Sequence, residues 1–323
     1  MTAVADIRAE KLLKQLADVW KELGKNESEY AVVRACSMTL IVATTADDEQ
    51  DLGATLGELM HSHPSRYIVL RVKPGDESTF TARVFAQCQL AFGRRQQLCC
   101  EQIEFTATRD RIADFHAVAL GLTVPDLPVL LWIKDPKLLF APEFDQVLRL
   151  ARPLLIDSAD FDDAAAGLAE LDTRRRAGWR IKDINWSRLT VWRETIAQMF
   201  EASNCRELAA SIDRIDVRGE NKKPGADALY LAAWLAQRLP AARVNTAGSG
   251  VARLRLFAGS RTLEVTGARE ALFATALDGL ITRVPAPLRS DADLIDEELS
   301  ILGSDSVFDA TLPDALRCAR MNV

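Results

Sequence analysis

Apolar residues gather in short runs along the first half of the chain, and stretches with helical spacing separate these runs. The almost wholly apolar runs cover residues 37–44, 67–72, 128–134 and 154–157. Uninterrupted runs of this length are typical of strands that are buried on both faces of a parallel sheet. The intervening stretches have apolar residues three or four positions apart, which predicts helices at 47–61, 110–122 and 143–150.

Two longer runs, 79–92 and 97–108, also predict strands, and the connection between them includes Gly93-Arg94-Arg95. This connection is too short for a crossover, so we expect the two strands to be antiparallel neighbours. Strands and helices that follow in this order imply an α/β fold with a Rossmann-like layered sheet, mainly parallel, with some antiparallel pairing. We assign this sheet domain to residues 30–160.

The second half of the chain has a different pattern. Helices are expected at 161–176 and 187–202, within a helical segment, 161–204, that leads out of the sheet. Further strands are expected at 212–217, 253–257 and 262–266, and further helices at 226–239 and 269–280. Their mixture predicts a smaller α+β domain at 205–323.

Two amphipathic or charged stretches leave alternatives open. Apolar residues at helical intervals predict an amphipathic helix within residues 1–29 that ends near Gly24, and its apolar face fits either its own domain or another subunit. The stretch 291–299 is strongly acidic and fits either a solvated helix or a docking surface.

The stretch 183–194 concentrates tryptophan and arginine at an expected helix start. Asn185 is well placed to cap the first turn with its side-chain oxygen. Apolar residues from Leu189 onward then recur at helical spacing, which predicts one buried stripe.

Arg188 and Arg193 fall off this stripe, beside Trp186 and Trp192. Arginine next to tryptophan is the composition of many interface hot spots, so these four residues are candidates for binding a partner. The other interpretation makes both tryptophans core residues and both arginines solvated or locally paired.

The same stretch, Asp-Ile-Asn-Trp-Ser-Arg-Leu-Thr-Val-Trp-Arg-Glu, resembles the Trp-x-Arg-Leu-Thr-x-Trp-Arg signature of the glucose-6-phosphate dehydrogenase assembly protein family, called OpcA. Three further segments resemble that family in the same order. They are residues 34–42, residues 63–66, and residues 125–132 followed by 155–158. The resemblance runs from about residue 30 to residue 202.

The resemblance implies a non-catalytic assembly factor or allosteric activator that binds glucose-6-phosphate dehydrogenase, the entry enzyme of the oxidative pentose phosphate pathway. The alternative is an enzyme or sensor that acts on a sugar phosphate at the carboxyl edge of the sheet. No Gly-x-Gly-x-x-Gly follows the first strand and no Gly-x-x-x-x-Gly-Lys-Ser/Thr occurs, so we expect no dinucleotide or nucleotide cofactor.

Composition narrows the classes of protein to which this chain can belong. The net charge of −6 argues against general nucleic-acid binding, which needs a clustered basic surface. No run of about 18 uncharged apolar residues occurs and the N-terminus has no apolar signal core, so we expect a cytoplasmic protein without a membrane span. The six cysteines lack Cys-x-x-Cys spacing and only three histidines accompany them, which argues against zinc.

Residues 61–66 offer imidazole, hydroxyl and guanidinium groups together. Sequence neighbours rarely converge as a catalytic triad, so we interpret this turn as structural. Ser65 would satisfy a backbone group, and Arg66 would meet Asp157 or Asp126. The candidate anion-binding or structural cluster is Arg34, His63, Ser65, Arg66, Asp126 and Asp157.

Cys99 and Cys100 are adjacent in an expected strand, so their side chains point to opposite faces. No cysteine partner is evident nearby, and we expect buried thiols rather than a redox switch. Glu101 and Glu104 form a carboxylate pair that needs no pocket, and we expect them on a solvated face or at a helix cap.

Overall fold

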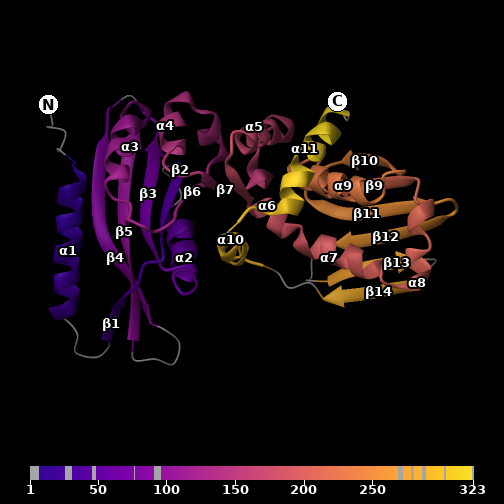
Figure 1. Ribbon diagram of the computed structural model, residues 1–323, viewed down its shortest axis with the longest axis horizontal. Helices are drawn as coiled ribbons and strands as arrows, with labels where there is room; N and C mark the ends of the chain where they lie inside the picture. Colours follow the sequence, from indigo (N-terminus) through magenta and orange to yellow (C-terminus); the bar gives the residue numbers. More distant parts are fainter. Residues whose placement is uncertain are drawn as a thin grey trace. The chain divides into compact units, whose positions relative to one another are not determined.

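The chain divides into two compact units (Figure 1). The computed structural model describes residues 7–25, 31–45, 49–75, 77–90, 96–267, 272–277, 280–285, 289–301 and 303–321. The first unit comprises Met1–Ile156 together with Asp291–Ser300, and the second comprises Asp157–Ser290 together with Ile301–Val323. The first unit is therefore built from two separate stretches of sequence.

The first unit contains a mainly parallel sheet, which confirms the α/β class. Its strands follow the order β1-β5-β3-β2-β6-β7, all in parallel pairs, and β4 pairs antiparallel with β5. Their bounds are β1 (Ala31–Arg34), β2 (Met38–Thr45), β3 (Ser65–Lys73), β4 (Phe80–Leu90), β5 (Gln96–Thr108), β6 (Val129–Ile133) and β7 (Pro153–Ile156). The mostly apolar runs in β2 and β3 are buried, as parallel strands covered on both faces should be.

Helices cover both faces of this sheet. They are α1 (Ala9–Lys25), α2 (Glu49–Leu59), α3 (Ile112–Leu120), α4 (Asp145–Leu148) and α10 (Asp291–Ser300), with short 3₁₀ turns at Arg109–Arg111, Pro136–Phe140 and Pro142–Phe144. Helix α1 contacts β4 and buries Leu12 and Leu16, so its apolar face packs within its own unit. The acidic helix α10 contacts α2 and buries Leu294, Ile295 and Leu299, so it is only partly a solvated surface.

The second unit is built on a mixed sheet with the order β10-β9-β11-β12-β13-β14, whose strands are drawn in orange in Figure 1. Strands β9 and β10 are parallel, and the remaining neighbours are antiparallel. The strands of this unit are β8 (Arg180–Asp183), β9 (Arg214–Gly219), β10 (Arg243–Ala247), β11 (Val251–Ala258), β12 (Arg261–Gly267), β13 (Leu272–Leu277) and β14 (Leu280–Pro285). The helices are α5 (Ala164–Arg176), α6 (Ile184–Arg188), α7 (Thr190–Met199), α8 (Ser203–Arg206), α9 (Ala226–Arg238) and α11 (Ser306–Met321), with 3₁₀ turns at Ser158–Asp160 and Ala209–Ser211.

The helix expected at 269–280 is wrong, because its central residues form strand β13. Short apolar runs satisfy both helical and extended periodicity, and pairing partners decide between them. Here β13 pairs with β12 on one side and β14 on the other, which a helix could not do. Residues 268–271 and 278–279 lie outside the described part of the chain.

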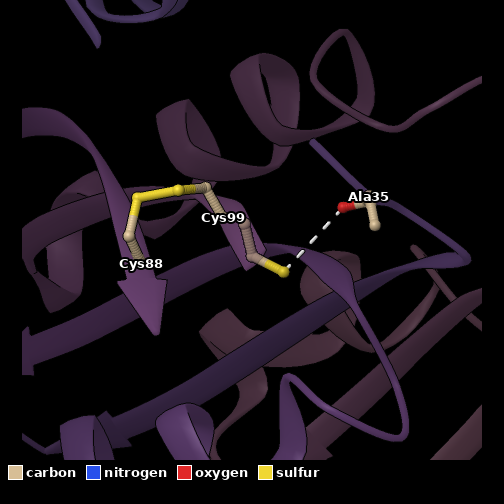
Figure 2. Close-up of a disulfide and its surroundings, with 4 residues drawn as sticks. Ala35, Cys88 and Cys99 are labelled. Carbon is tan, nitrogen blue, oxygen red and sulfur yellow. Dashed lines mark hydrogen bonds between the residues drawn. A yellow bond between two sulfur atoms is a disulfide. The ribbon is translucent and has the colours of Figure 1, made fainter. Parts of the chain in front are cut away.

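Two cysteines on neighbouring strands form a disulfide (Figure 2). Cys88 of β4 and Cys99 of β5 stand opposite each other in the antiparallel register, and their Sγ atoms are bonded at 2.02 Å. The expectation that Cys99 has no cysteine partner nearby is therefore wrong, because strand register brings in a residue 11 positions away in the sequence.

The expected opposite orientation of the two adjacent side chains is confirmed. The Cys100 thiol donates to the backbone oxygen of Ala35 at 3.8 Å, the contact dashed in Figure 2, whereas Cys99 is bonded to Cys88. Burial raises the pKa of the Cys100 thiol to about 11, so it remains protonated and unreactive at neutral pH.

The disulfide predicts the number of reactive thiols. In protein kept under oxidising conditions and denatured without reductant, we expect Cys36, Cys100, Cys205 and Cys318 to be alkylated, and all six cysteines after reduction. The cross-link closes a short loop and should add roughly 2–3 kcal/mol to the free energy of unfolding. Mass spectrometry of the alkylated protein and urea unfolding with and without reductant measure the two effects.

The matched variant is Cys88→Ser, which frees the Cys99 thiol and should make unfolding insensitive to reductant. Complete alkylation of the oxidised wild-type protein before reduction would contradict the pairing.

Candidate protein-interaction site

The signature stretch 183–194 is an interrupted helix rather than one continuous helix. Strand β8 ends at Asp183, α6 follows, and Leu189 separates α6 from α7. The expected Asn185 cap is wrong. The Asp183 carboxylate accepts the N-terminal hydrogen bond instead, from the backbone N–H of Asn185 at 3.0 Å. The Asn185 side chain is buried and donates to Ser158 Oγ at 3.0 Å.

Asp183 is the centre of a buried polar network. Its Oδ1 also accepts from the backbone N–H of Ser158 at 3.0 Å, and its Oδ2 accepts from the Tyr230 hydroxyl at 2.7 Å. Burial, and then the neighbouring charge of Asp157, raise the pKa of Asp183 to about 6. The network joins the 3₁₀ turn at Ser158–Asp160, the start of α6 and helix α9.

Trp186 is packed among aromatic rings of the second unit. Its ring lies 5.8 Å from Tyr230 and 5.7 Å from Phe308 between centroids, and its indole N–H donates to Asp305 Oδ2 at 2.8 Å. The Arg193 guanidinium stacks 3.6 Å from the Trp186 centroid. Arg193 therefore has a packing role that its place outside the apolar stripe did not indicate.

Arg193 also makes two hydrogen bonds near this ring. It donates from Nη1 to the Trp186 carbonyl and from Nη2 to Thr190 Oγ1, both at 2.9 Å. Trp192 packs against β12, where a Cβ added to Gly267 would lie 2.8 Å from the indole Cζ2. Only a residue without a side chain allows this close approach.

Arg188 is the most exposed of the four predicted contact residues. Its side chain is 40% exposed and pairs with both carboxylate oxygens of Asp157, at 3.1 and 2.7 Å. Trp186 and Trp192 are only 3% and 7% exposed. These placements fit the core interpretation for both tryptophans and local pairing for both arginines.

An apolar groove of about 270 Å³ lies beside the signature helix, between α7 and α9. Its lining residues are Ile196, Ala197, Phe200, Arg206, Ala209, Trp234, Leu235, Arg238 and Leu239. Arg206 and Arg238 are both exposed and are the charged members of this set.

Aromatic stacking positions Arg238 at the groove. Its guanidinium lies 4.3 Å from the Trp234 centroid and donates to the Trp234 carbonyl at 2.9 Å. Partial burial lowers the pKa of Arg238, although the group stays charged at neutral pH. Sequence reasoning missed this site because α7 and α9 are more than 25 residues apart and their shared groove has no sequence motif.

The candidate anion-binding cluster does not assemble as one site. Arg34 and Arg66 both meet the buried Glu101, at 2.5 and 2.6 Å, and Trp20 donates to the same carboxylate at 2.8 Å. The expected pairing of Arg66 with Asp157 or Asp126 is wrong, as is the solvated position expected for Glu101. Backbone folding brings β1, β3, β5 and α1 together here, so the carboxylate is neutralised inside the unit.

The remaining members of that cluster lie elsewhere. His63 Nε2 is 3.3 Å from Asp296 of α10, and Ser65 donates to the His63 carbonyl at 2.8 Å, which confirms its backbone-satisfying role. Asp126 is exposed in the turn before β6 with φ of 64°, a conformation that Asp tolerates. Asp157 belongs to the second unit, with Arg188.

Neither a metal site nor a membrane-spanning helix is found among the residues that the structure describes. No cluster of three or more His, Cys, Asp or Glu side chains there is arranged to hold a metal ion. None of the helices in these described ranges is both long and apolar enough to cross a bilayer.

Comparison with known families gives two matches along the chain. A model described as the glucose-6-phosphate dehydrogenase subunit N-terminal domain matches residues 57–173, and one described as the C-terminal domain matches residues 179–312. OpcA of Nostoc punctiforme is 29% identical over 186 residues, and OpcA of Synechocystis sp. is 31% identical over 179 residues. Both names refer to the OxPP cycle. These matches cover 56% and 55% of this chain but only 39% and 38% of the relatives, so the similarity spans less than half of each relative.

Solved structures with a similar fold share little sequence identity with this chain. A variant of KijD10, a 3-ketoreductase from Actinomadura kijaniata, is 11% identical with a TM-score of 0.50, over 88% of this chain and 95% of that chain. An aldose-aldose oxidoreductase from Caulobacter crescentus is 10% identical with a TM-score of 0.48, over 88% of this chain and 98% of that chain. At such identity the likeness concerns the fold alone.

The raised pKa of Asp183 predicts a pH-dependent contribution to stability. The folded protein keeps this proton up to about pH 6, whereas the unfolded chain releases it near pH 4. The stabilising contribution is therefore complete below about pH 4 and is lost as the pH rises through about 6. Relative to Asp183→Asn, wild type should lose on the order of 2 kcal/mol of unfolding free energy between these limits.

Urea unfolding of both proteins across this pH range measures the difference. The exposed Asp213→Asn serves as the control and should show no such change. A difference between wild type and Asp183→Asn that stays constant with pH would contradict the prediction.

Substitutions of Trp186 and Arg188 should differ in their cost to stability, because Trp186 is a core residue and Arg188 lies at the surface. Trp186→Ala removes a buried ring and should cost about 3–5 kcal/mol of unfolding free energy. Arg188→Ala breaks a half-exposed ion pair and should cost no more than about 1 kcal/mol. Equal losses in urea unfolding would show that Arg188 is as much a core residue as Trp186.

Proposed function

Because the chain belongs to the glucose-6-phosphate dehydrogenase assembly protein family, OpcA, we propose that it binds glucose-6-phosphate dehydrogenase and promotes its active state without catalysing a reaction itself. The observation that carries this proposal is the pair of family models, both described as dehydrogenase subunit domains, that match residues 57–173 and 179–312. The OxPP cycle named for its relatives fits the same role in the oxidative pentose phosphate pathway. We place this role in the cytoplasm.

We further propose that the groove between α7 and α9 is the contact surface. It is lined mainly by apolar side chains, of which Phe200 is half-buried, and it carries Arg206 and Arg238. A partner segment with an apolar side chain next to a carboxylate would bury the first in the groove and pair the second with a guanidinium. The packed signature residues then hold α7 in place.

Binding alone would not activate the dehydrogenase. The chain must bind the active conformation or oligomer more tightly than the inactive one, because only a difference in affinity shifts such an equilibrium. A tenfold shift needs a difference of about 1.4 kcal/mol.

Charge reversal at the groove tests the contact surface. Arg238→Glu and Arg206→Glu should each weaken binding to the dehydrogenase from the same organism by about 5- to 50-fold, because a carboxylate would face a carboxylate. Affinity is measured by isothermal titration calorimetry, and dehydrogenase activity is followed against glucose-6-phosphate concentration in the presence of each variant.

Arg218→Glu is the matched control, since it reverses an exposed arginine on β9 outside the groove. If both groove variants bind with wild-type affinity and Arg188→Ala binds more weakly, the contact surface lies at α6 instead of the groove. If the wild-type chain neither binds the dehydrogenase nor changes its activity, the proposed function itself fails.

A further inference from the structure

A buried guanidinium without a hydrogen-bond partner lies in the first unit. Arg71 of β3 is 4% exposed, and its Nε and Nη1 atoms make no hydrogen bond to any described residue. Its nearest carboxylate oxygen, Oε1 of Glu104, is 3.7 Å from Nη2, which is too long for a hydrogen bond. A buried charge in this state is costly unless another group compensates it.

Glu104 compensates Arg71 only in part, because they form a long ion pair and other groups already hydrogen-bond to both Glu104 oxygens. Its Oε2 accepts from Arg83 Nε at 2.6 Å, and its Oε1 accepts from Gln102 Nε2 at 2.7 Å. One carboxylate thus faces two guanidinium groups and pairs closely with only one of them. The expectation that Glu104 lies on a solvated face is wrong, since the residue is 6% exposed.

Arg71 lines a pocket of about 180 Å³ at the end of the sheet. The other lining residues are Thr81, Ala82, Arg83, Glu104 and Thr106. Arg71, Thr106 and Thr81 stand side by side across β3, β5 and β4, so a guanidinium and two hydroxyl groups line the same pocket. The side chain of Arg83 is 60% exposed, which leaves this end of the pocket accessible from solvent.

The charges and size of the pocket select its ligand. Two guanidinium groups and one carboxylate leave one net positive charge. The volume corresponds to about six water molecules, which is enough for a tetrahedral oxyanion but too small for a whole nucleotide. The pocket also lies near the carboxyl ends of the parallel strands β3 and β5, where open α/β sheets bind ligands.

We propose that this pocket binds a phosphate group, with Arg71 and the hydroxyl groups of Thr81 and Thr106 as donors. The phosphate comes either from inorganic phosphate or from a phosphorylated sugar whose remaining atoms extend past Arg83. The site is distinct from the groove at α7, and it does not depend on binding to the dehydrogenase.

The test uses the full chain alone in buffer free of phosphate and sulfate. Inorganic phosphate and glucose 6-phosphate are titrated separately while the melting temperature and the heat of binding are measured. Glucose and sodium chloride at matched ionic strength are the blanks. We expect the melting temperature to rise by several degrees at saturation, because the ligand binds the folded state only. A response at lower concentration of glucose 6-phosphate than of inorganic phosphate identifies a sugar phosphate as the source, and the reverse identifies the free ion.

Arg71→Met should abolish this response and, without ligand, melt no lower than wild type, because it removes a buried charge that Glu104 compensates only in part. Arg109→Met, which changes an exposed arginine of the same unit, should respond like wild type. If Arg71→Met does not fold, Thr106→Val tests the same pocket and should weaken binding by about fivefold through one lost hydrogen bond.

Two results would overturn the proposal. One is a wild-type protein that responds to neither ligand, which would leave a water-filled pocket. The other is a phosphate response that survives in Arg71→Met or, where that variant does not fold, in Thr106→Val at wild-type affinity. Because these measurements use no dehydrogenase, their failure leaves the proposed function intact, and failure of dehydrogenase binding leaves this site intact.

Discussion

The buried carboxylate of Asp183 imposes the strongest local constraint on the second unit. A carboxyl group that is 1% exposed must be hydrogen-bonded, and each of its donors comes from a different part of the chain. Satisfying it orders the turn at Ser158, the first turn of α6 and the Tyr230 hydroxyl together. Trp186 then packs on Tyr230, and Arg193 on Trp186. The composition of the family signature is thus explained by packing before any partner is considered.

The first unit contains two buried carboxylates, Glu101 and Glu104, whose surrounding hydrogen-bond donors and acceptors are balanced to different degrees. Glu101 accepts hydrogen bonds or ion pairs from Trp20, Arg34 and Arg66, and Arg66 also donates to a backbone carbonyl at 2.8 Å. At Glu104 the donors outnumber the acceptors, and Arg71 is left over. The fully paired network at Glu101 fixes the relative positions of a helix and three strands. The network at Glu104 leaves hydrogen-bond donors of Arg71 unpaired, and these donors can bind a ligand.

Local patterns predicted much of the fold, because buried parallel strands such as 37–44 and 67–72 are apolar along most of their length. The same logic identified Ser65 as a residue that satisfies the backbone. It could not predict that Arg66 meets Glu101 or that Cys88 faces Cys99, since both depend on strand register between distant segments. At 272–277 the apolar run fits two periodicities, and pairing with β12 and β14 decides for a strand. The sequence could not show that Arg71 lacks hydrogen-bond acceptors, because that shortage depends on which side chains surround it in three dimensions.

The return of α10 to the first unit has a consequence for biosynthesis. Residues 291–300 are translated 135 positions after the first stretch of that unit ends at residue 156. At roughly 5–20 residues per second, the surface of α2 that α10 covers stays open for about 7–27 seconds on the ribosome. The second unit is largely synthesised during this interval. Completion of the first unit therefore waits for nearly the whole chain, so the two units mature together rather than one after the other.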